Sequence, residues 1–269
     1  MIKKRIFAGV SAIMLAAALT GCGGTKNETV STDGSTSMEK VIGYLSEAYM
    51  DSHDGTKVTY NPTGSGAGIQ AVMSGSCDIG LSSRDLKDDE AQTLDSTIVA
   101  IDGIAIIVNK DNPIADLSID QIEKIYTGEV ESWSDIGGSD SPIVCIGREA
   151  ASGTRDGFES ITGTEDKCKY AQELTSTGDV IQTVASNPNA IGYASIAAVG
   201  DTVKTVSVGG VEPTEENIKA GNYLLSRPFV MATNGEIAQQ SDAVKALFDY
   251  LASDEGKEVI KTVGLILPD

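Results

Sequence analysis

An apolar run over residues 98–108, IVAIDGIAIIV, constrains the fold most strongly, because its length and its β-branched residues are typical of a buried central strand. Strand-like and helix-like segments alternate around it. The other predicted strands are 57–60, 78–81, 143–146 and 191–194, and the predicted helices are 38–49, 68–73, 118–125, 154–161, 177–186 and 241–263. This alternation predicts α/β layers. A folded body of about 240 residues is long enough for two domains.

The N-terminal residues 1–21 have the pattern of a secretory signal peptide, with three basic residues at 3–5 before a short apolar stretch, 6–19. That stretch is short for a transmembrane helix. Residues 19–22, LTGC, resemble a bacterial lipobox, so we expect cleavage before Cys22 and lipid attached to its sulfur. The alternatives are an ordinary signal peptide and a transmembrane helix.

The residues that follow, 22–33, are small and polar, and we expect them to form a flexible, lipid-anchored tether. The protein would then lie outside the cytoplasm, attached to the outer face of the cell membrane. The net charge of the whole chain is −19, and it becomes −22 without residues 1–21, which carry three basic and no acidic side chains. This acidity argues against a nucleic-acid partner, because phosphates in a nucleic acid need a basic surface.

Four segments rich in serine, threonine and glycine follow a predicted strand or precede a predicted helix: 33–37, 62–68, 80–84 and 147–158. A helix N-terminus exposes unpaired N–H groups and the positive end of the helix dipole, and glycine lets an oxyanion approach the backbone. Each segment alone is more typical of a helix cap or a turn. The four segments together with Arg148, whose planar guanidinium suits an oxyanion, predict an anion-binding site.

Templates for catalysis fit the sequence poorly. It contains no P-loop and no GxSxG motif, and its single histidine, His53, lies in a predicted exposed turn. We therefore expect no catalytic residue, no metal and no cofactor. Of the other arginines, Arg155 is expected to pair with Glu159 one helical turn later, and Arg84 to cap a strand end or pair with Asp85.

Three cysteines remain once Cys22 is assigned to lipid, and an odd number leaves at least one free thiol or an intermolecular bond. Cys77 and Cys145 are predicted to be small buried residues. A disulfide between Cys168 and either of them stays open.

The motifs together resemble the phosphate-binding proteins of bacterial ABC importers, the PstS type, over essentially the whole mature chain. They occur in family order: the lipobox, GSTS (34–37), NPTGSGAGI (61–69), DIGLSSR (78–84), LSIDQIEKIYTGEVESWSDIGG (117–138), REAASGTRDGFE (148–159), NPNAIGYAS (187–195) and YLLSRPF (223–229).

The resemblance implies a type II periplasmic-binding-protein-like fold, with two α/β domains of mixed sheets flanked by helices. It divides the chain into domain I, 34–105 and 228–269, and domain II, 106–227, with hinge crossings at 101–109 and 223–229. It also implies a function: a monomer that captures inorganic phosphate between the domains and delivers it to the permease and ATPase subunits of an ABC importer.

The phosphate ligands implied by the resemblance are Thr36, Ser37, Ser65, Gly66, Ser83, Arg148, Ser152, Gly153 and Thr154. The sequence departs from the family at two positions. Many members carry an aspartate in place of Ser83, and an acid in place of Ala150. Glu149 is expected to orient Arg148 instead. The open alternatives are a binding protein for sulfate, molybdate or tungstate, a secreted phosphatase, and a sensor or adhesion role.

Overall fold

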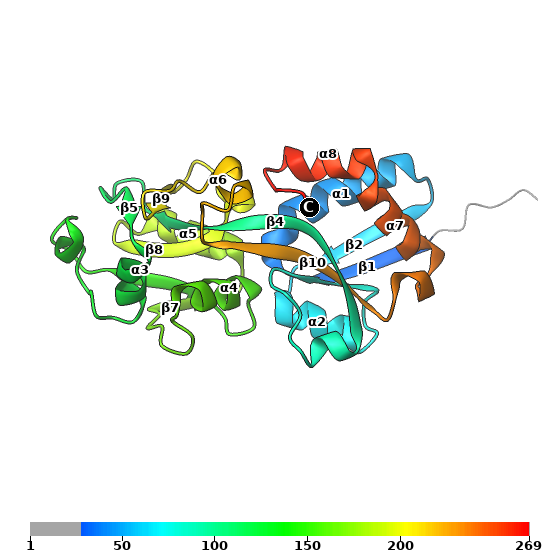
Figure 1. Cartoon of the computed structure of the whole chain (residues 1–269), viewed down its shortest axis with the longest axis horizontal. Coiled ribbons are helices and arrows are strands. Elements are labelled where there is room, and N and C mark those ends of the chain that lie inside the picture. Colours follow the sequence, from blue (N-terminus) through cyan, green and yellow to red (C-terminus); the bar gives the residue numbers. More distant parts are fainter. Residues whose placement is uncertain (1–27, 269) are drawn as a thin grey trace, which may run out of the picture.

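The apolar run forms β4 (Leu94–Val108), the longest strand in the part of the chain that the computed structural model describes, residues 28–268. Residues 94–103 of β4 pair antiparallel with β10 (Ser226–Asn234), and residues 104–108 pair antiparallel with β8 (Ala190–Ser195). β4 therefore leaves one half of the sheet and enters the other immediately after Gly103. Figure 1 shows β4 and β10 running side by side between two lobes, where the hinge crossings are predicted.

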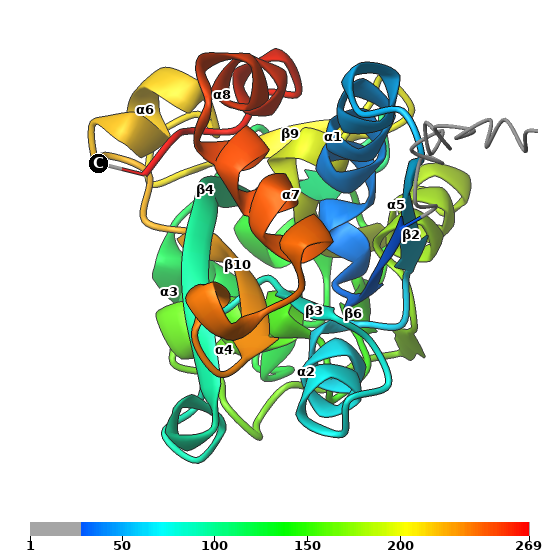
Figure 2. The same cartoon turned by 90° about the vertical axis from the view of Figure 1, so that its right-hand side faces the viewer.

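The first lobe is built on a mixed sheet in which β1 pairs parallel with β2 and β3, and β10 runs antiparallel to β3. α1, α7 and α8 cover one face of this sheet and α2 covers the other (Figures 1 and 2). The elements of this lobe, besides β10 and the first part of β4, are β1 (Glu28–Gly34), α1 (Glu39–Ser52), β2 (Thr56–Asn61), α2 (Ser65–Met73), β3 (Ile79–Ser82), α7 (Asp242–Ala252) and α8 (Asp254–Thr262).

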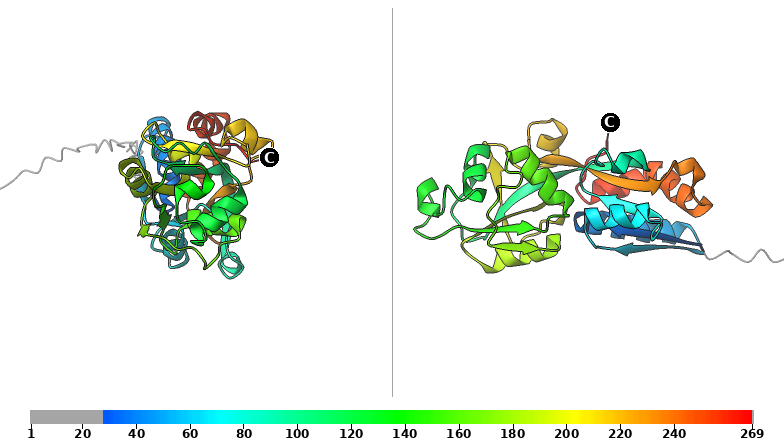
Figure 3. Two further views of the ribbon diagram at one scale, coloured as in Figure 1. Left: turned by 90° about the vertical axis from the view of Figure 1, so that its left-hand side faces the viewer. Right: turned by 90° about the horizontal axis from the view of Figure 1, so that it is seen from below.

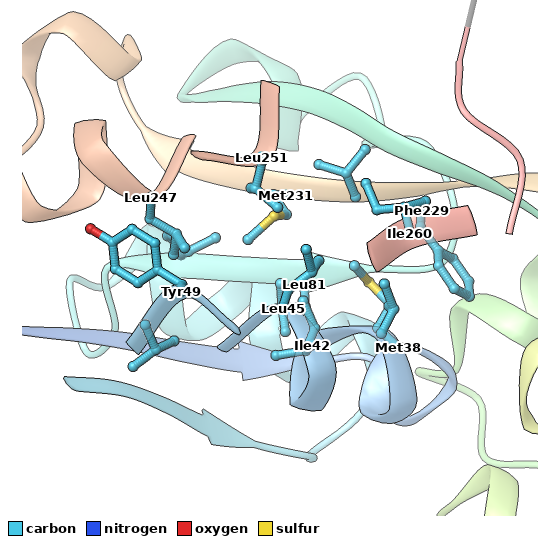
Figure 4. Packing of buried hydrophobic residues seen from close by; sticks show 14 of the residues in the cluster. Met38, Ile42, Leu45, Tyr49, Leu81, Phe229, Met231, Leu247, Leu251 and Ile260 are labelled. Atoms are coloured by element: carbon cyan, nitrogen blue, oxygen red, sulfur yellow. The ribbon is translucent and has the colours of Figure 1, made fainter. Parts of the chain in front are cut away.

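The core of the first lobe confirms the helical spacing predicted for residues 38–49. Met38, Ile42, Leu45 and Tyr49 recur every three or four residues, and all are buried. They belong to one hydrophobic cluster with residues from α7, α8 and the strands. Figure 4 shows this packing, with Leu81, Phe229, Met231, Leu247, Leu251 and Ile260 completing the labelled set.

The second lobe continues the sheet beyond β4, and Figure 3 shows it beside the first lobe. β6 pairs parallel with both β8 and β7, and β9 pairs antiparallel with β4. Besides β8 and the second part of β4, the elements of this lobe are β5 (Asp116–Leu117), α3 (Ile119–Tyr126), β6 (Val144–Arg148), α4 (Gly153–Thr162), β7 (Gln172–Leu174), α5 (Thr177–Ser186), β9 (Lys204–Val208) and α6 (Glu215–Lys219). Across the described residues the strand order is β2-β1-β3-β10-β4-β8-β6-β7, with β9 and β5 off this path. The predicted two-domain α/β fold is confirmed.

The tether prediction is wrong for residues 28–33, which form most of β1. Val30, Thr32 and Gly34 are buried while the residues between them are partly exposed, which is the alternation of a half-buried strand. The rest of the predicted tether, the signal peptide and Cys22 lie outside the described residues. Within residues 28–268, no helix is both long and apolar enough to cross a membrane.

The single C-terminal helix predicted over 241–263 is also wrong, because two helices meet at Ser253. The Ser253 hydroxyl accepts a hydrogen bond from the N–H of Gly256 at 3.1 Å and so caps the start of α8. A Cβ on Gly256 would lie 2.3 Å from the carbonyl oxygen of Tyr250, so the turn closes tightly there. A serine cap and a close backbone approach therefore break the helix.

The three cysteines of the described chain are all free, so neither possible disulfide forms. Cys145 is buried, as predicted. Cys77 is only half-buried, contrary to prediction, because it lies in the turn between α2 and β3 rather than inside a strand.

Candidate anion-binding site

Four helix starts bring hydroxyl groups from the two lobes together. A 3₁₀ turn, Thr36–Met38, leads into α1, and α2 begins at Ser65; α4 and α5 begin at Gly153 and Thr177 in the second lobe. Each of these helix starts has unpaired backbone N–H groups and the positive end of a helix dipole. We call the six side chains gathered at this junction the hydroxyl cluster: Thr36, Ser37, Ser65, Ser83, Thr154 and Thr177.

Within the hydroxyl cluster, oxygens from opposite lobes lie at hydrogen-bond distance. Ser37 Oγ is 2.9 Å from Thr154 Oγ1 and 3.0 Å from Thr177 Oγ1. Thr36 Oγ1 is 3.1 Å from Thr177 Oγ1 and accepts a hydrogen bond from the Thr177 N–H at 3.2 Å. The lobes therefore meet through polar groups that can exchange these partners for an oxyanion.

Ser65 and Ser83 form the remaining part of the cluster, against the first residue of α4. Their hydroxyl oxygens are 3.1 Å apart, and the Ser83 N–H donates to Ser65 Oγ at 3.1 Å. A Cβ on Gly153 would lie 2.6 Å from Ser65 Oγ and 2.9 Å from Ser83 Oγ. Gly153 is therefore needed for the close approach of the lobes, rather than for an unusual backbone angle.

Arg148 is the last residue of β6 and lies next to the hydroxyl cluster. Only 2% of its surface is exposed. Its Nε and Nη2 donate to the two carboxylate oxygens of Glu149, both at 2.9 Å, and Nε also donates to the carbonyl oxygen of Leu174 at 3.1 Å. Its Nη1 donates to Thr177 Oγ1 at 3.1 Å. The guanidinium thus turns one edge to Glu149 and presents Nη1 to the hydroxyl cluster, where an anion would meet it.

The hydroxyl cluster is closed to solvent, since each member is no more than 4% exposed. Buried hydroxyls need hydrogen-bond partners, which these residues supply to one another, and an oxyanion with several acceptor oxygens is of a kind that can replace those partners. In residues 28–268, no group of three or more histidine, cysteine, aspartate or glutamate side chains is arranged to hold a metal ion.

Two predicted ligands are engaged differently from the others. Ser152 Oγ accepts hydrogen bonds from the N–H groups of Thr154 and Arg155, at 3.2 and 3.4 Å, and so caps α4. The N–H of Gly66 donates to the carbonyl oxygen of Ala151 at 2.9 Å, a backbone link between the lobes. The structure brings the other seven predicted ligands together, and it places Glu149 directly on Arg148.

Thr177 belongs to the cluster but is absent from the predicted ligand set. The signal was present, because Ser176-Thr177-Gly178 follows a strand and opens a helix, as the four selected segments do. Its place beside Thr36 and Arg148 depends on how the lobes close, which local sequence does not reveal.

The surrounding arginines have structural partners. Arg155 pairs with Glu159 at 2.7 Å, as predicted, and also donates to the carbonyl oxygen of Arg148 at 3.0 Å, which steadies the end of β6. Arg84 contacts Asp85, but through the backbone of Asp85 and not as the predicted ion pair. It donates to the backbone oxygen of Asp85, and its ion pairs are with Glu90 and Asp156 at 2.8 Å each, because tertiary packing brings better-placed carboxylates to it.

Comparison with known proteins identifies the family of the chain. A family model described as a PBP superfamily domain matches residues 22–255. The phosphate-binding protein PstS of Staphylococcus haemolyticus is 30% identical over 243 residues, which cover 84% of this chain and 77% of that protein. A phosphate ABC transporter substrate-binding protein from Clostridium perfringens, solved with bound phosphate, is 39% identical with a TM-score of 0.86, covering 90% of this chain and 100% of that chain. An ABC-type phosphate transport receptor from Vibrio cholerae is 35% identical with a TM-score of 0.74, covering 89% of this chain and 100% of that chain. The chain therefore belongs to the PstS family of phosphate-binding proteins.

Proposed function

We propose that this chain captures inorganic phosphate in the hydroxyl cluster between its lobes and delivers it to the permease and ATPase subunits of an ABC importer. The observation that carries the proposal is the meeting of buried hydroxyls from both lobes with the Nη1 of a guanidinium whose other edge Glu149 holds. A strongly acidic protein has no positive surface field to attract an anion, so the attraction comes from these aimed dipoles and one buried cation.

Phosphate would enter while the lobes are apart and then bridge them. Its oxygens would take the places that the hydroxyls of Ser37, Thr154 and Thr177 now fill for one another. Each charge-assisted hydrogen bond contributes about 1.5–3 kcal/mol. Since these bonds come from both lobes only when the lobes are together, phosphate shifts the population toward the closed form. No bond of the ligand is made or broken, so the chain acts as a carrier rather than an enzyme.

Several features of the cellular setting belong to the same proposal. Lipid on Cys22 would hold the monomer at the outer face of the membrane, with residues 22–27 as the link to β1.

The proposal also divides the chain into two domains. Domain I would comprise 28–105 and 228–269, and domain II 106–227. β4 changes its partner from β10 to β8 after Gly103, two residues before the proposed boundary, and this supports a boundary in that part of β4.

Sulfate is the competing ligand that the site chemistry makes most relevant. Ser83 contributes a hydroxyl, which can donate as well as accept, and therefore does not require a protonated oxygen on the anion. Both carboxylate oxygens of Glu149 are occupied by Arg148. Neither Ser83 nor Glu149 is therefore a dedicated acceptor for a proton of phosphate, so a side-by-side titration with sulfate measures the preference.

The test is calorimetric titration of a soluble form that begins at Gly23, unfolded and refolded beforehand to remove bound anion. Phosphate, sulfate and molybdate are titrated separately into the parent protein and into Arg148→Met. Lys124→Gln, which removes an exposed cation of α3, is the matched control. We expect tight one-to-one phosphate binding that is lost in Arg148→Met and retained in Lys124→Gln. Retention of micromolar phosphate affinity by Arg148→Met would overturn the assigned site, and equal sulfate affinity would make the protein a general oxyanion carrier. Hydrolysis of a generic phosphomonoester by the parent protein would contradict the carrier role.

A further inference from the structure

Arg84 directly follows the cluster residue Ser83, yet its guanidinium is bound to carboxylates. Nη1 and Nη2 donate to the two carboxylate oxygens of Glu90 at 2.8 and 2.9 Å, and Nη1 also donates to the carbonyl oxygen of Asp85 at 2.7 Å. Arg84, Asp85 and Glu90 all belong to the first lobe. These three bonds fix the plane of the guanidinium, and they leave the Nε edge for a partner outside the lobe.

That partner is Asp156, in the second lobe. Its Oδ2 lies 2.8 Å from Arg84 Nε and 3.9 Å from Lys87 Nζ. Asp156 is in the first turn of α4, the helix whose first residues Gly153 and Thr154 border the hydroxyl cluster. The ion pair therefore joins the chain beside Ser83 to the helix that begins at Gly153, and it exists only when the lobes are close enough for the cluster to assemble.

The ion pair lies beside open space at this edge, near the Gly66–Ala151 backbone hydrogen bond that also joins the lobes. Arg84 and Asp156 line two cavities, of about 530 and 520 Å³, and each cavity is bordered by both lobes. Gly157 and Arg227 line the first cavity, and Gly66 and Ala151 line the second. The ion pair is thus the charged contact between the lobes beside these two cavities.

A bound anion would replace the hydroxyl contacts but not the ion pair between Arg84 and Asp156. An anion would replace the contacts among Ser37, Thr154 and Thr177. It would leave Arg84 and Asp156 untouched, because neither makes a contact with the hydroxyl cluster in the hydrogen bonds and ion pairs of the described chain.

We propose that Arg84 and Asp156 form an interdomain latch, a pair of positioning residues that stabilises the closed form without touching the ligand. Glu90 holds Arg84 in place for this role. This inference rests on the proposed function, and it adds a source of affinity that is independent of which anion is bound. A latch of this kind slows the escape of the anion, because the lobes must separate before the anion leaves. It does not change the rate of capture by the open form.

The test compares phosphate association and dissociation rates, measured by stopped flow, in the parent protein and in Asp156→Asn. Asp120→Asn is the matched control, because Asp120 pairs with Lys124 at 2.8 Å within α3 alone. We expect Asp156→Asn to raise the dissociation rate about threefold to tenfold, and to raise the observed association rate only in proportion to the larger open fraction. Arsenate, a second tetrahedral anion, should show the same factor. The control should match the parent protein.

A second test needs no ligand: small-angle scattering measures the radius of gyration of the anion-free protein. Asp156→Asn should increase the radius of gyration relative to the parent protein, and Asp156→Glu should restore part of the compaction. Unchanged dissociation rates in Asp156→Asn would overturn the latch, as would factors that differ between phosphate and arsenate, since these would indicate direct contact. If the parent protein binds no phosphate, the proposed function fails, and the scattering comparison alone then decides on the latch.

Discussion

The hydroxyl oxygen of Ser37 lies 2.9 Å from that of Thr154, although the two residues are 117 positions apart and belong to different lobes. Ser37 is in the turn that leads into α1, and Thr154 is the second residue of α4. One contact therefore connects two helix starts and marks the place where the lobes meet. The anion-binding account depends on this junction, and the predictions below test its parts.

Gly153→Ala should block closure without harming the fold. The added Cβ would lie 2.6 Å from Ser65 Oγ and 2.9 Å from Ser83 Oγ, both in the opposite lobe, so only the closed form is strained. We expect the Kd for phosphate to rise about tenfold to 100-fold, measured by calorimetry. The thermal unfolding of anion-free protein should not change.

Gly178→Ala is the control for this change, because a Cβ at the second residue of α5 meets only Ser176 Oγ, at 3.9 Å. Equal phosphate affinity in Gly153→Ala and Gly178→Ala would show that the lobes do not close as described.

Thr177→Val should weaken phosphate binding although Thr177 lies outside the predicted ligand set. The variant keeps the shape of the side chain and removes the hydroxyl that lies beside Thr36, Ser37 and Arg148 Nη1. Loss of one hydrogen bond to a charged ligand costs about 1.5–3 kcal/mol, so the Kd should rise by roughly tenfold or more. Thr183→Val, later in α5, should bind as the parent protein does; an effect of the same size there would point to the helix rather than to the hydroxyl.

Asp102→Asn should lower the free energy of unfolding by about 3–5 kcal/mol, because it leaves the buried Arg227 without its counter-charge. Asp102 accepts hydrogen bonds from Arg227 Nη2 at 3.0 Å and from Ser195 Oγ at 2.8 Å, at the point where β4 changes partners. Urea unfolding measures the loss. The double variant Asp102→Asn/Arg227→Met should recover part of it, and an undiminished loss in the double variant would contradict the charge argument.

The three thiols should be unreactive in the folded protein at pH 8. Burial raises the pKa of Cys145 to about 12; burial, with the negative charges of Asp33 and Asp78, raises the pKa of Cys77 to about 11. Burial also raises the pKa of Cys168. The thiolate is the nucleophile, and a thiol of pKa 11 is only about 0.1% thiolate at pH 8.

Mass spectrometry after iodoacetamide treatment checks this prediction on the soluble form. Alkylation should be slow at pH 8, should accelerate as the pH rises toward 10, and should become fast at pH 8 once urea unfolds the chain. Rapid alkylation of Cys145 in the folded protein at pH 8 would contradict its burial.

The sequence was sufficient where local chemistry decides structure. The face of Met38, Ile42 and Leu45 follows from helical periodicity, and the capping box of Ser118 and Gln121 begins α3 one residue from the predicted start. The central strand also follows from its composition alone. Helix starts rich in hydroxyls pointed to the candidate site for the same reason, because their N–H groups and dipoles are local properties.

The features that escaped sequence reasoning depend on tertiary contact. Glu90 and Asp156 reach Arg84 only after the chain between them has folded, and Thr177 joins the cluster only when the lobes meet. The sequence of β1 is typical of a linker because its exposed residues are polar, although the strand pairs with two others at once. The helical pattern of the sequence continues through Ser253, although this residue caps a new helix by accepting a hydrogen bond from Gly256. The close approach of Gly256 to Tyr250 exists only in the folded protein.

The most direct test of the account is an X-ray crystal structure of the soluble form with phosphate at saturating concentration. We predict one tetrahedral anion between the lobes, with an oxygen about 2.7–3.2 Å from Arg148 Nη1 and other oxygens bonded to hydroxyls of both Ser37 and Thr154. An anion held by one lobe alone, or one found instead in the cavity beside Arg84 and Arg227, would contradict the central claim.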